Sequence, residues 1–213
     1  ILDPACTMSV PRMQVISGAF DTLSHAMETY FGNSDEDNVS DDVALAVMRN
    51  TVVNMKRLLG NIDDTQARGN LMGDSAMAEN GTLKVGRVTD FQCHQMEHQL
   101  GAYTDCNHGQ GMAVLHPAYY RHIFRDGLDK FGRFAANVWM IPREKKSREE
   151  LAAAGLDALE AFIRELGLPT SLRQLGVRDK KQLPVIAGSC HFSPGGYRKM
   201  MPEEILEILQ ECF

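Results

Sequence analysis

Long apolar stretches are missing from the 213-residue sequence. None approaches the roughly 18 residues that a membrane-spanning helix needs, so a transmembrane protein is not expected. An excess of basic residues is missing too, because the formal net charge is -6. A nucleic-acid-binding face would be basic. We therefore expect neither a membrane nor a nucleic acid as a partner.

The cysteines have neither the number nor the spacing of a disulfide framework. There are five of them, and no C-x-x-C pair occurs. They are scattered as Cys6, Cys93, Cys106, Cys190 and Cys212. This pattern is typical of reduced thiols in a cytosolic protein, so we expect a cytoplasmic location.

Strand patterns are nearly absent, whereas apolar residues recur at helical spacing along most of the chain. The first helix is expected from about Pro11 to Phe31, followed by a polar loop at residues 33–38. Ser40 is expected to cap a second helix that stops at Gly60.

The following helices are marked by their caps and breakers. A third helix is expected around residues 64–79, and a fourth, capped by Asp90, carries His94 and His98 and ends near Gly101.

The remaining helices can be placed in the same way. One begins near His108 and contains Pro117, where we expect a kink. Ser147-Arg-Glu-Glu150 is a capping box that opens a long amphipathic helix, and the last helix begins near Pro202. Because no interdomain linker is visible, residues 1–213 are predicted to form one all-α domain of about eight to ten helices.

Five polar residues stand out on these helices. Asp21 and His25 form a D-x-x-x-H step, His94 and His98 form an H-x-x-x-H step, and His108 follows the next turn. Helical residues four apart share a face, so the members of each pair can reach one ion. One carboxylate with several imidazoles suits Fe2+ or Zn2+. The sequence therefore predicts a metal site in which four of these groups are ligands and one position stays open.

The same residues have plainer interpretations. An isolated D-x-x-x-H step is most often a surface pair, but these helices are rich in apolar residues, where buried ionisable groups are costly unless paired or metal-bound. A rival zinc site would add Cys93 and Cys106. Because neighbouring helical residues point about 100° apart, Cys93 and His94 are not expected to bind the same ion.

Other titratable residues lie close to this group in sequence. We interpret His116 and His122 as ordinary, partly exposed residues and His191 as a loop residue. Glu28 and Glu97 are offset around their helices from the histidines, so we do not expect either carboxylate to be a ligand.

Three segments resemble the iron-containing (group III) alcohol dehydrogenases, and the similarity looks closest to the butanol-dehydrogenase-like branch. They are Phe20-Asp-Thr-Leu-Ser-His-Ala-Met-Glu28, His94-Gln-Met-Glu-His-Gln-Leu-Gly-Ala102 and Asn107-His-Gly-Gln-Gly-Met-Ala-Val-Leu-His-Pro117. The resemblance extends along essentially the whole chain. It implies the all-helical C-terminal domain of that family, with the N-terminal nucleotide-binding domain absent from this chain.

The resemblance also implies a role for each residue. In that family one aspartate and three histidines hold the metal, and the matching positions are Asp21, His25, His94 and His108. A further histidine, associated with proton movement near the substrate and the nicotinamide, falls on His98. His116 stands where the branch commonly has an apolar or aromatic residue, which predicts a more polar pocket wall.

The implied enzyme interconverts a primary alcohol and its aldehyde with NAD(P)(H) and Fe2+ or Zn2+, and is commonly oligomeric at full length. We expect the isolated domain to be inactive, because neither Gly109-Gln-Gly111 nor Gly195-Gly196 has the strand–turn–helix setting of a phosphate loop. The residues that bind the nicotinamide cofactor are therefore unknown.

Three alternatives remain open at this stage. One is a propanediol or lactaldehyde dehydrogenase, or a transhydrogenase, of the same superfamily. Another is a non-catalytic, metal-binding helical domain. The third is a hydrolase, since a histidine-rich metal site with an open position can also activate water.

Overall fold

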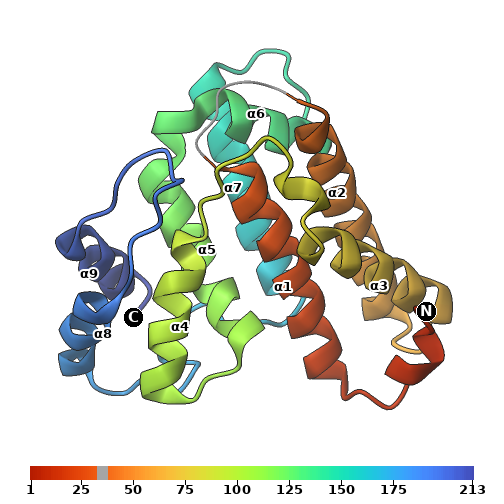
Figure 1. Ribbon diagram of the computed structural model, residues 1–213, viewed down its shortest axis with the longest axis horizontal. Coiled ribbons are helices and arrows are strands. Elements are labelled where there is room, and N and C mark those ends of the chain that lie inside the picture. The colour runs from red at the N-terminus through yellow and green to blue at the C-terminus, as the bar shows by residue number, and fades with distance from the viewer. Residues whose placement is uncertain (33–37) are drawn as a thin grey trace.

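The computed structural model describes residues 1–32 and 38–213, and these ranges fold into nine α-helices and four short 3-10 helices with no strand (Figure 1). The α-helices are α1 (Arg12–Tyr30), α2 (Val39–Gly60), α3 (Thr65–Glu79), α4 (Gln92–Thr104), α5 (His108–Ile123), α6 (Leu128–Asn137), α7 (Arg148–Glu165), α8 (Leu183–Ser189) and α9 (Pro202–Glu211). The 3-10 helices are η1 (Pro4–Thr7), η2 (Thr82–Lys84), η3 (Phe124–Gly127) and η4 (Lys180–Gln182). The all-α prediction is confirmed. The polar loop expected at residues 33–38 lies, apart from Asn38, outside the described ranges.

Capping residues explain several helix ends. The capping box between Ser147 and Glu150 opens α7, and α9 begins with Pro202, as the sequence predicts. The side chain of Asn107 caps α5, which then continues through Pro117.

Two predicted caps are wrong. The side chain of Asn38 caps α2, whereas the hydroxyl of Ser40 bonds to a loop carbonyl instead. The residue that precedes α4 is Phe91, which has a left-handed φ of 53°. Asp90 lies one residue further from the helix, and its Oδ1 accepts a hydrogen bond from the amide of Gln92 at 3.3 Å.

Helix α1 lies at the centre of the molecule. It packs against α2, α3 and α5, while α4 lies along α5 and the α8–α9 pair is at one edge (Figure 1). The α1–α5 approach is closest at Gly109, where a Cβ atom would lie 2.1 Å from the carbonyl oxygen of Ser17. Only glycine fits there, and the close approach brings the first turn of α5 against α1.

The apolar side chains of the described helices form one continuous core. An aromatic stack between Phe31 and Phe131, with ring centroids 4.1 Å apart, joins the end of α1 to α6. Over the described residues, no helix combines the length and the apolar character that crossing a membrane requires.

Candidate metal centre

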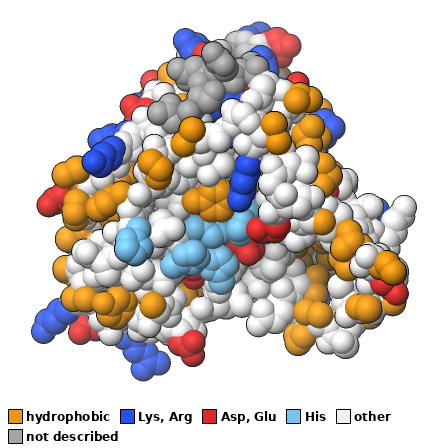
Figure 2. Space-filling model, viewed as in Figure 1, with side chains coloured by type: hydrophobic (Ala, Val, Ile, Leu, Met, Phe, Trp, Pro, Cys, Tyr) orange, Lys and Arg blue, Asp and Glu red, His pale blue; other side chains and the backbone are white. Residues whose placement is uncertain are grey.

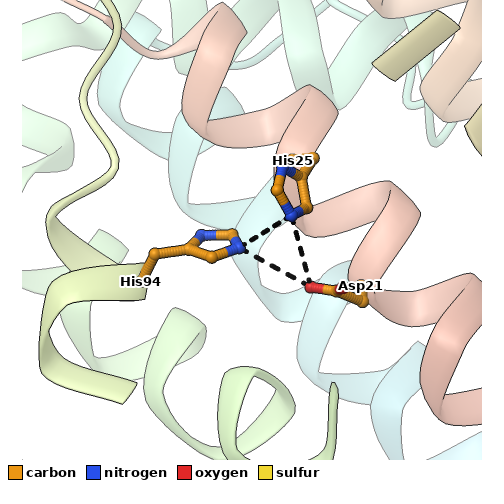
Figure 3. A group of neighbouring side chains, drawn as sticks. All are labelled: Asp21, His25 and His94. Atoms are coloured by element: carbon orange, nitrogen blue, oxygen red, sulfur yellow. Dashed lines mark hydrogen bonds and ion pairs between the residues drawn. The ribbon is translucent and has the colours of Figure 1, made fainter. Parts of the chain in front are cut away.

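The candidate site is centred on one carboxylate oxygen of α1. Asp21 Oδ1 lies 3.8 Å from His25 Nε2, one turn further along α1, and 3.6 Å from His94 Nε2 of α4. The two Nε2 atoms are 3.0 Å apart. Figure 3 shows the three side chains pointing toward one another across the space between the helices.

The fourth predicted ligand joins this group from α5. His108 Nε2 lies 3.3 Å from Asp21 Oδ1. A tetrahedral ion with bonds of about 2.0–2.2 Å holds its ligand atoms about 3.3–3.6 Å apart. The separations within this cluster, 3.0–3.8 Å, bracket that range.

The chemistry of the donors also fits a cation. Asp21 Oδ1 is buried and accepts no hydrogen bond from the described residues. A buried carboxylate oxygen without a partner is costly. A divalent ion among Asp21 and the three imidazoles removes that cost, because it supplies positive charge where the protein supplies no donor.

Carboxylates hold the opposite nitrogen of two of these imidazoles. Glu28 Oε2 accepts a hydrogen bond from His94 Nδ1, and Glu97 Oε2 accepts one from His108 Nδ1. A proton fixed on Nδ1 leaves the Nε2 lone pair free to face an ion. The sequence pattern did not reveal these roles, because each carboxylate reaches its histidine only in the folded chain.

The first turn of α5 also makes room for Glu97. A Cβ atom on Gly111 would lie 2.6 Å from Glu97 Oε1, so a side chain at this position would displace the carboxylate. Glycine at 109 and at 111 therefore serves two contacts, one with α1 and one with α4.

The surrounding charges shift the pKa values of the imidazoles. Burial alone would lower the pKa of His94, but the carboxylates of Asp21 and Glu28 outweigh it and raise it to about 9. Contacts with Asp21 and Glu97 raise the pKa of His108 to about 10. Burial and the neighbouring His94 lower the pKa of His25 to about 4. Two of the three imidazoles thus lie in an environment that favours positive charge.

His98 lies at the mouth of the site. Its ring is stacked on that of His108, with centroids 5.6 Å apart, and is edge-on to that of His94 at 5.9 Å. The side chain is exposed, and burial of part of the ring together with the nearby His94 lowers its pKa. Figure 2 shows the histidines gathered in one patch on the face of the molecule, beside acidic side chains.

The histidine of α5 that was expected to be partly exposed is buried. His116 is fully buried, and its Nε2 lies 2.6 Å from Ser24 Oγ in a hydrogen bond that joins α5 to α1. The prediction of exposure is wrong because His116 lies on the face of α5 that packs on α1. His122 is partly exposed and pairs with Glu204, and His191 lies in a loop, as expected.

The cysteines near the site do not face its centre. Cys93 is buried, and burial raises the pKa of its thiol well above the usual value. Cys106 Sγ lies 3.8 Å from Glu97 Oε1. All five cysteines are free, which agrees with the prediction of reduced thiols.

A groove of about 880 Å³ lies beside the site. Phe91 belongs to both, because its ring is 5.4 Å from the ring of His25 and 5.0 Å from that of His94, between centroids. Val88 and Phe192 add apolar surface to the walls of the groove. His116 does not line it, so the predicted polar wall is not found there.

Known proteins share this fold and sequence. The family model described as "Fe-containing alcohol dehydrogenase family, C-terminal" matches residues 15–213. A crystal structure of NADH-dependent butanol dehydrogenase A from Thermotoga maritima superposes with a TM-score of 0.90 at 30% identity, over 99% of this chain and 55% of that one.

Two curated relatives are also similar. NADH-dependent butanol dehydrogenase A of Clostridium acetobutylicum is 35% identical over 100% of this chain and 56% of its own length. A 1,3-propanediol dehydrogenase of Citrobacter freundii is 28% identical over 100% of this chain and 54% of its own. The chain thus spans about half the length of these relatives.

Proposed function

The chain belongs to the Fe-containing alcohol dehydrogenase family, and on this premise we propose that residues 1–213 form the metal-binding half of an NAD(P)(H)-dependent enzyme. The reaction is the interconversion of a primary alcohol and its aldehyde. The observation that carries the proposal is the position of Asp21 Oδ1, which faces the Nε2 atoms of three histidines at 3.3–3.8 Å.

The ligands in this proposal are Asp21, His25, His94 and His108, and the ion is Fe2+ or Zn2+. Bound there, the ion would supply Lewis-acid chemistry, which polarises a carbonyl and favours an alkoxide over an alcohol. Asp21 contributes one negative charge, so three neutral imidazoles and a dication leave a formal charge of about +1.

The buried carboxylates keep the imidazoles in one orientation. Glu28 and Glu97 each hold a proton on the Nδ1 atom that they contact, so that Nε2 of His94 and of His108 points to the centre. The resulting rigid cage needs little rearrangement when it binds substrate oxygen or releases it.

The substrate chain is assigned to the groove beside the site. Its walls at Val88, Phe91 and Phe192 are apolar, and Phe91 extends from the histidines into the groove. An aliphatic tail would bury hydrophobic surface there while the reacting carbon stays near the Nε2 atoms.

His98 is assigned the transfer of the proton between the reacting oxygen and solvent. It is exposed at the mouth of the site, and its ring lies against those of His94 and His108. A lowered pKa keeps the imidazole neutral at physiological pH, ready to accept a proton from the alcohol.

Nicotinamide binding is assigned to a second domain that would belong to the full-length protein. The described residues offer no strand–turn–helix phosphate loop, and the relatives are about twice as long as this chain. The 213-residue chain should therefore bind the metal without turning over substrate.

The test is metal analysis of purified protein together with turnover of butanal by the full-length enzyme. We expect about one Fe or Zn per chain, lost in His94→Ala, as the four-ligand site requires. His122→Ala, a histidine paired with Glu204 outside the site, should keep the metal and serves as the control. Full metal occupancy in His94→Ala would contradict the ligand assignment, and a metal-loaded enzyme that never reduces aldehydes would contradict the reaction.

A further inference from the structure

His25 has two differently placed nitrogens. Its Nε2 faces Asp21 Oδ1 and His94 Nε2 at the centre of the site. Its Nδ1 is buried on the other side of the ring and makes no aligned hydrogen bond. Glu79 Oε1 nevertheless lies 3.0 Å from this Nδ1 atom. Glu79 is the last residue of α3, a helix that carries none of the four ligands.

The contact repeats an arrangement at the other two histidines. Glu28 of α1 contacts Nδ1 of His94, and Glu97 of α4 contacts Nδ1 of His108. Each of the three imidazoles thus turns Nε2 toward the centre and Nδ1 toward a carboxylate, and the three carboxylates come from three different helices.

We propose that Glu79 is a positioning residue, which fixes His25 with its proton on Nδ1 and its Nε2 lone pair toward the ion. The inference rests on the metal site of the proposed function and adds a residue to it. A carboxylate on the outer nitrogen of a metal-binding imidazole sets its tautomer and orientation and raises its basicity. His25 has no other carboxylate at Nδ1, so Glu79 is the group that can do this.

Glu79 differs from the other two carboxylates in exposure. Its side chain is 47% exposed, whereas those of Glu28 and Glu97 are 0% and 3% exposed. Substitution of Glu79 therefore leaves no cavity and no unpaired charge in the core. A loss of metal affinity can then be ascribed to His25 and not to a damaged fold.

The position also connects α3 to the site. Helix α3 packs against α1 and α2, and its last turn ends beside His25. An ion that draws His25 toward the centre also draws its Nδ1 proton into line with the carboxylate. The end of α3 is thus held more firmly when the site is filled.

The experiment is a Zn2+ titration of the metal-free 213-residue chain against a chromophoric chelator. Glu79→Ala should weaken Zn2+ binding about 10-fold or more, the range expected for loss of such a partner. Glu79→Gln should lose less, because its amide oxygen still accepts from Nδ1. Glu165→Ala is the matched control: its side chain is also 47% exposed and also pairs with one residue, Lys56, but lies outside the site. It should bind Zn2+ as the unmodified chain does.

A double-mutant cycle separates action through His25 from a general effect of charge. In a His25→Ala background, Glu79→Ala should cause no further loss of affinity, because the imidazole that it positions is gone. The inference is overturned if Glu79→Ala binds Zn2+ as tightly as the unmodified chain, or if it weakens binding equally in both backgrounds. Those results leave the metal site intact, whereas an unmodified chain without Zn2+ affinity would overturn the site and this inference together.

Discussion

Gly109 of α5 lies directly against Ser17 of α1, so closely that a Cβ atom on Gly109 would be 2.1 Å from the Ser17 carbonyl oxygen. One residue earlier, His108 places Nε2 3.3 Å from Asp21 Oδ1. The shortest distance between two backbones is thus next to the contact that joins α5 to the candidate centre.

Gly109→Ala should push α5 away from α1. We expect a loss of about 1–3 kcal/mol in the free energy of unfolding, the usual cost of overpacking, and weaker Zn2+ binding because His108 moves with the helix. Gly18→Ala on α1 is the matched control, since nothing lies within 4 Å of its Cβ position. It should be neutral or stabilising by up to about 1 kcal/mol. Urea unfolding of both variants measures the difference, and equal stabilities would contradict the packing argument.

His98→Ala in the full-length enzyme should separate proton transfer from metal binding. The variant should keep its metal, because His98 is not among the four ligands, and should lose turnover by about 10²-fold or more. Metal analysis and steady-state kinetics measure the two effects, with His122→Ala as the control. Retained turnover would remove His98 from the reaction, and loss of metal would make it a ligand.

Asp90 should give the chain a stability component that decreases as the pH rises. Burial and the nearby Glu28 raise the pKa of this carboxyl to about 7, against 3.8 for an ordinary aspartate. The folded chain then binds the proton more tightly than the unfolded chain. The contribution is fully present below about pH 4 and is lost as the pH rises to about 7, by at most about 1.4 kcal/mol per pH unit.

Asp90→Asn tests this sign, because the amide keeps an oxygen that can accept from Tyr119 but no longer titrates. The difference in unfolding free energy between the unmodified chain and this variant should shrink or reverse between pH 4 and 7, in urea series at fixed ionic strength. Asp129→Asn, with a side chain 76% exposed, is the control and should leave the pH profile unchanged. A difference that grows with pH would contradict the raised pKa.

Phe91→Ala should change the preference for chain length. If the groove holds the aliphatic tail, the enzyme loses contacts with the methylenes beyond the reacting carbon, each worth up to about 0.8 kcal/mol. The ratio of kcat/KM for butanal to that for acetaldehyde should fall by up to about 10-fold. Val185→Ala, an exposed position on α8 outside the groove, should leave the ratio unchanged. An unchanged ratio in Phe91→Ala would place the tail elsewhere.

The sequence predicted what depends on helical spacing. Asp21 and His25, like His94 and His98, are one turn apart on a helix, and the structure places each pair on one face. The helix class and most helix ends followed from the same local rules of periodicity and capping. That the four ligands bind a metal remains a proposal.

Contacts between distant segments were beyond these rules. Glu28 is offset from the face that carries Asp21 and His25, and it is offset because it points to His94 on another helix. Glu79 lies at a helix end that no motif marks. His116 looked like a surface residue because nothing in the sequence indicates that its face of α5 packs on α1. Each case required the tertiary arrangement, which periodicity does not encode.

The central position of α1 has a consequence for how an ion would leave. The segment Ile16–Tyr30 of α1 is mostly buried, so its amide hydrogens should exchange with solvent only when the whole domain opens. Asp21 and His25 lie within that segment, while Glu79 is at the end of α3, where helices fray first. Deuterium should therefore enter around Glu79 long before it reaches the ligands of α1. Loss of the ion would be limited by escape through the exposed mouth at His98, and not by unravelling of the helix that holds it.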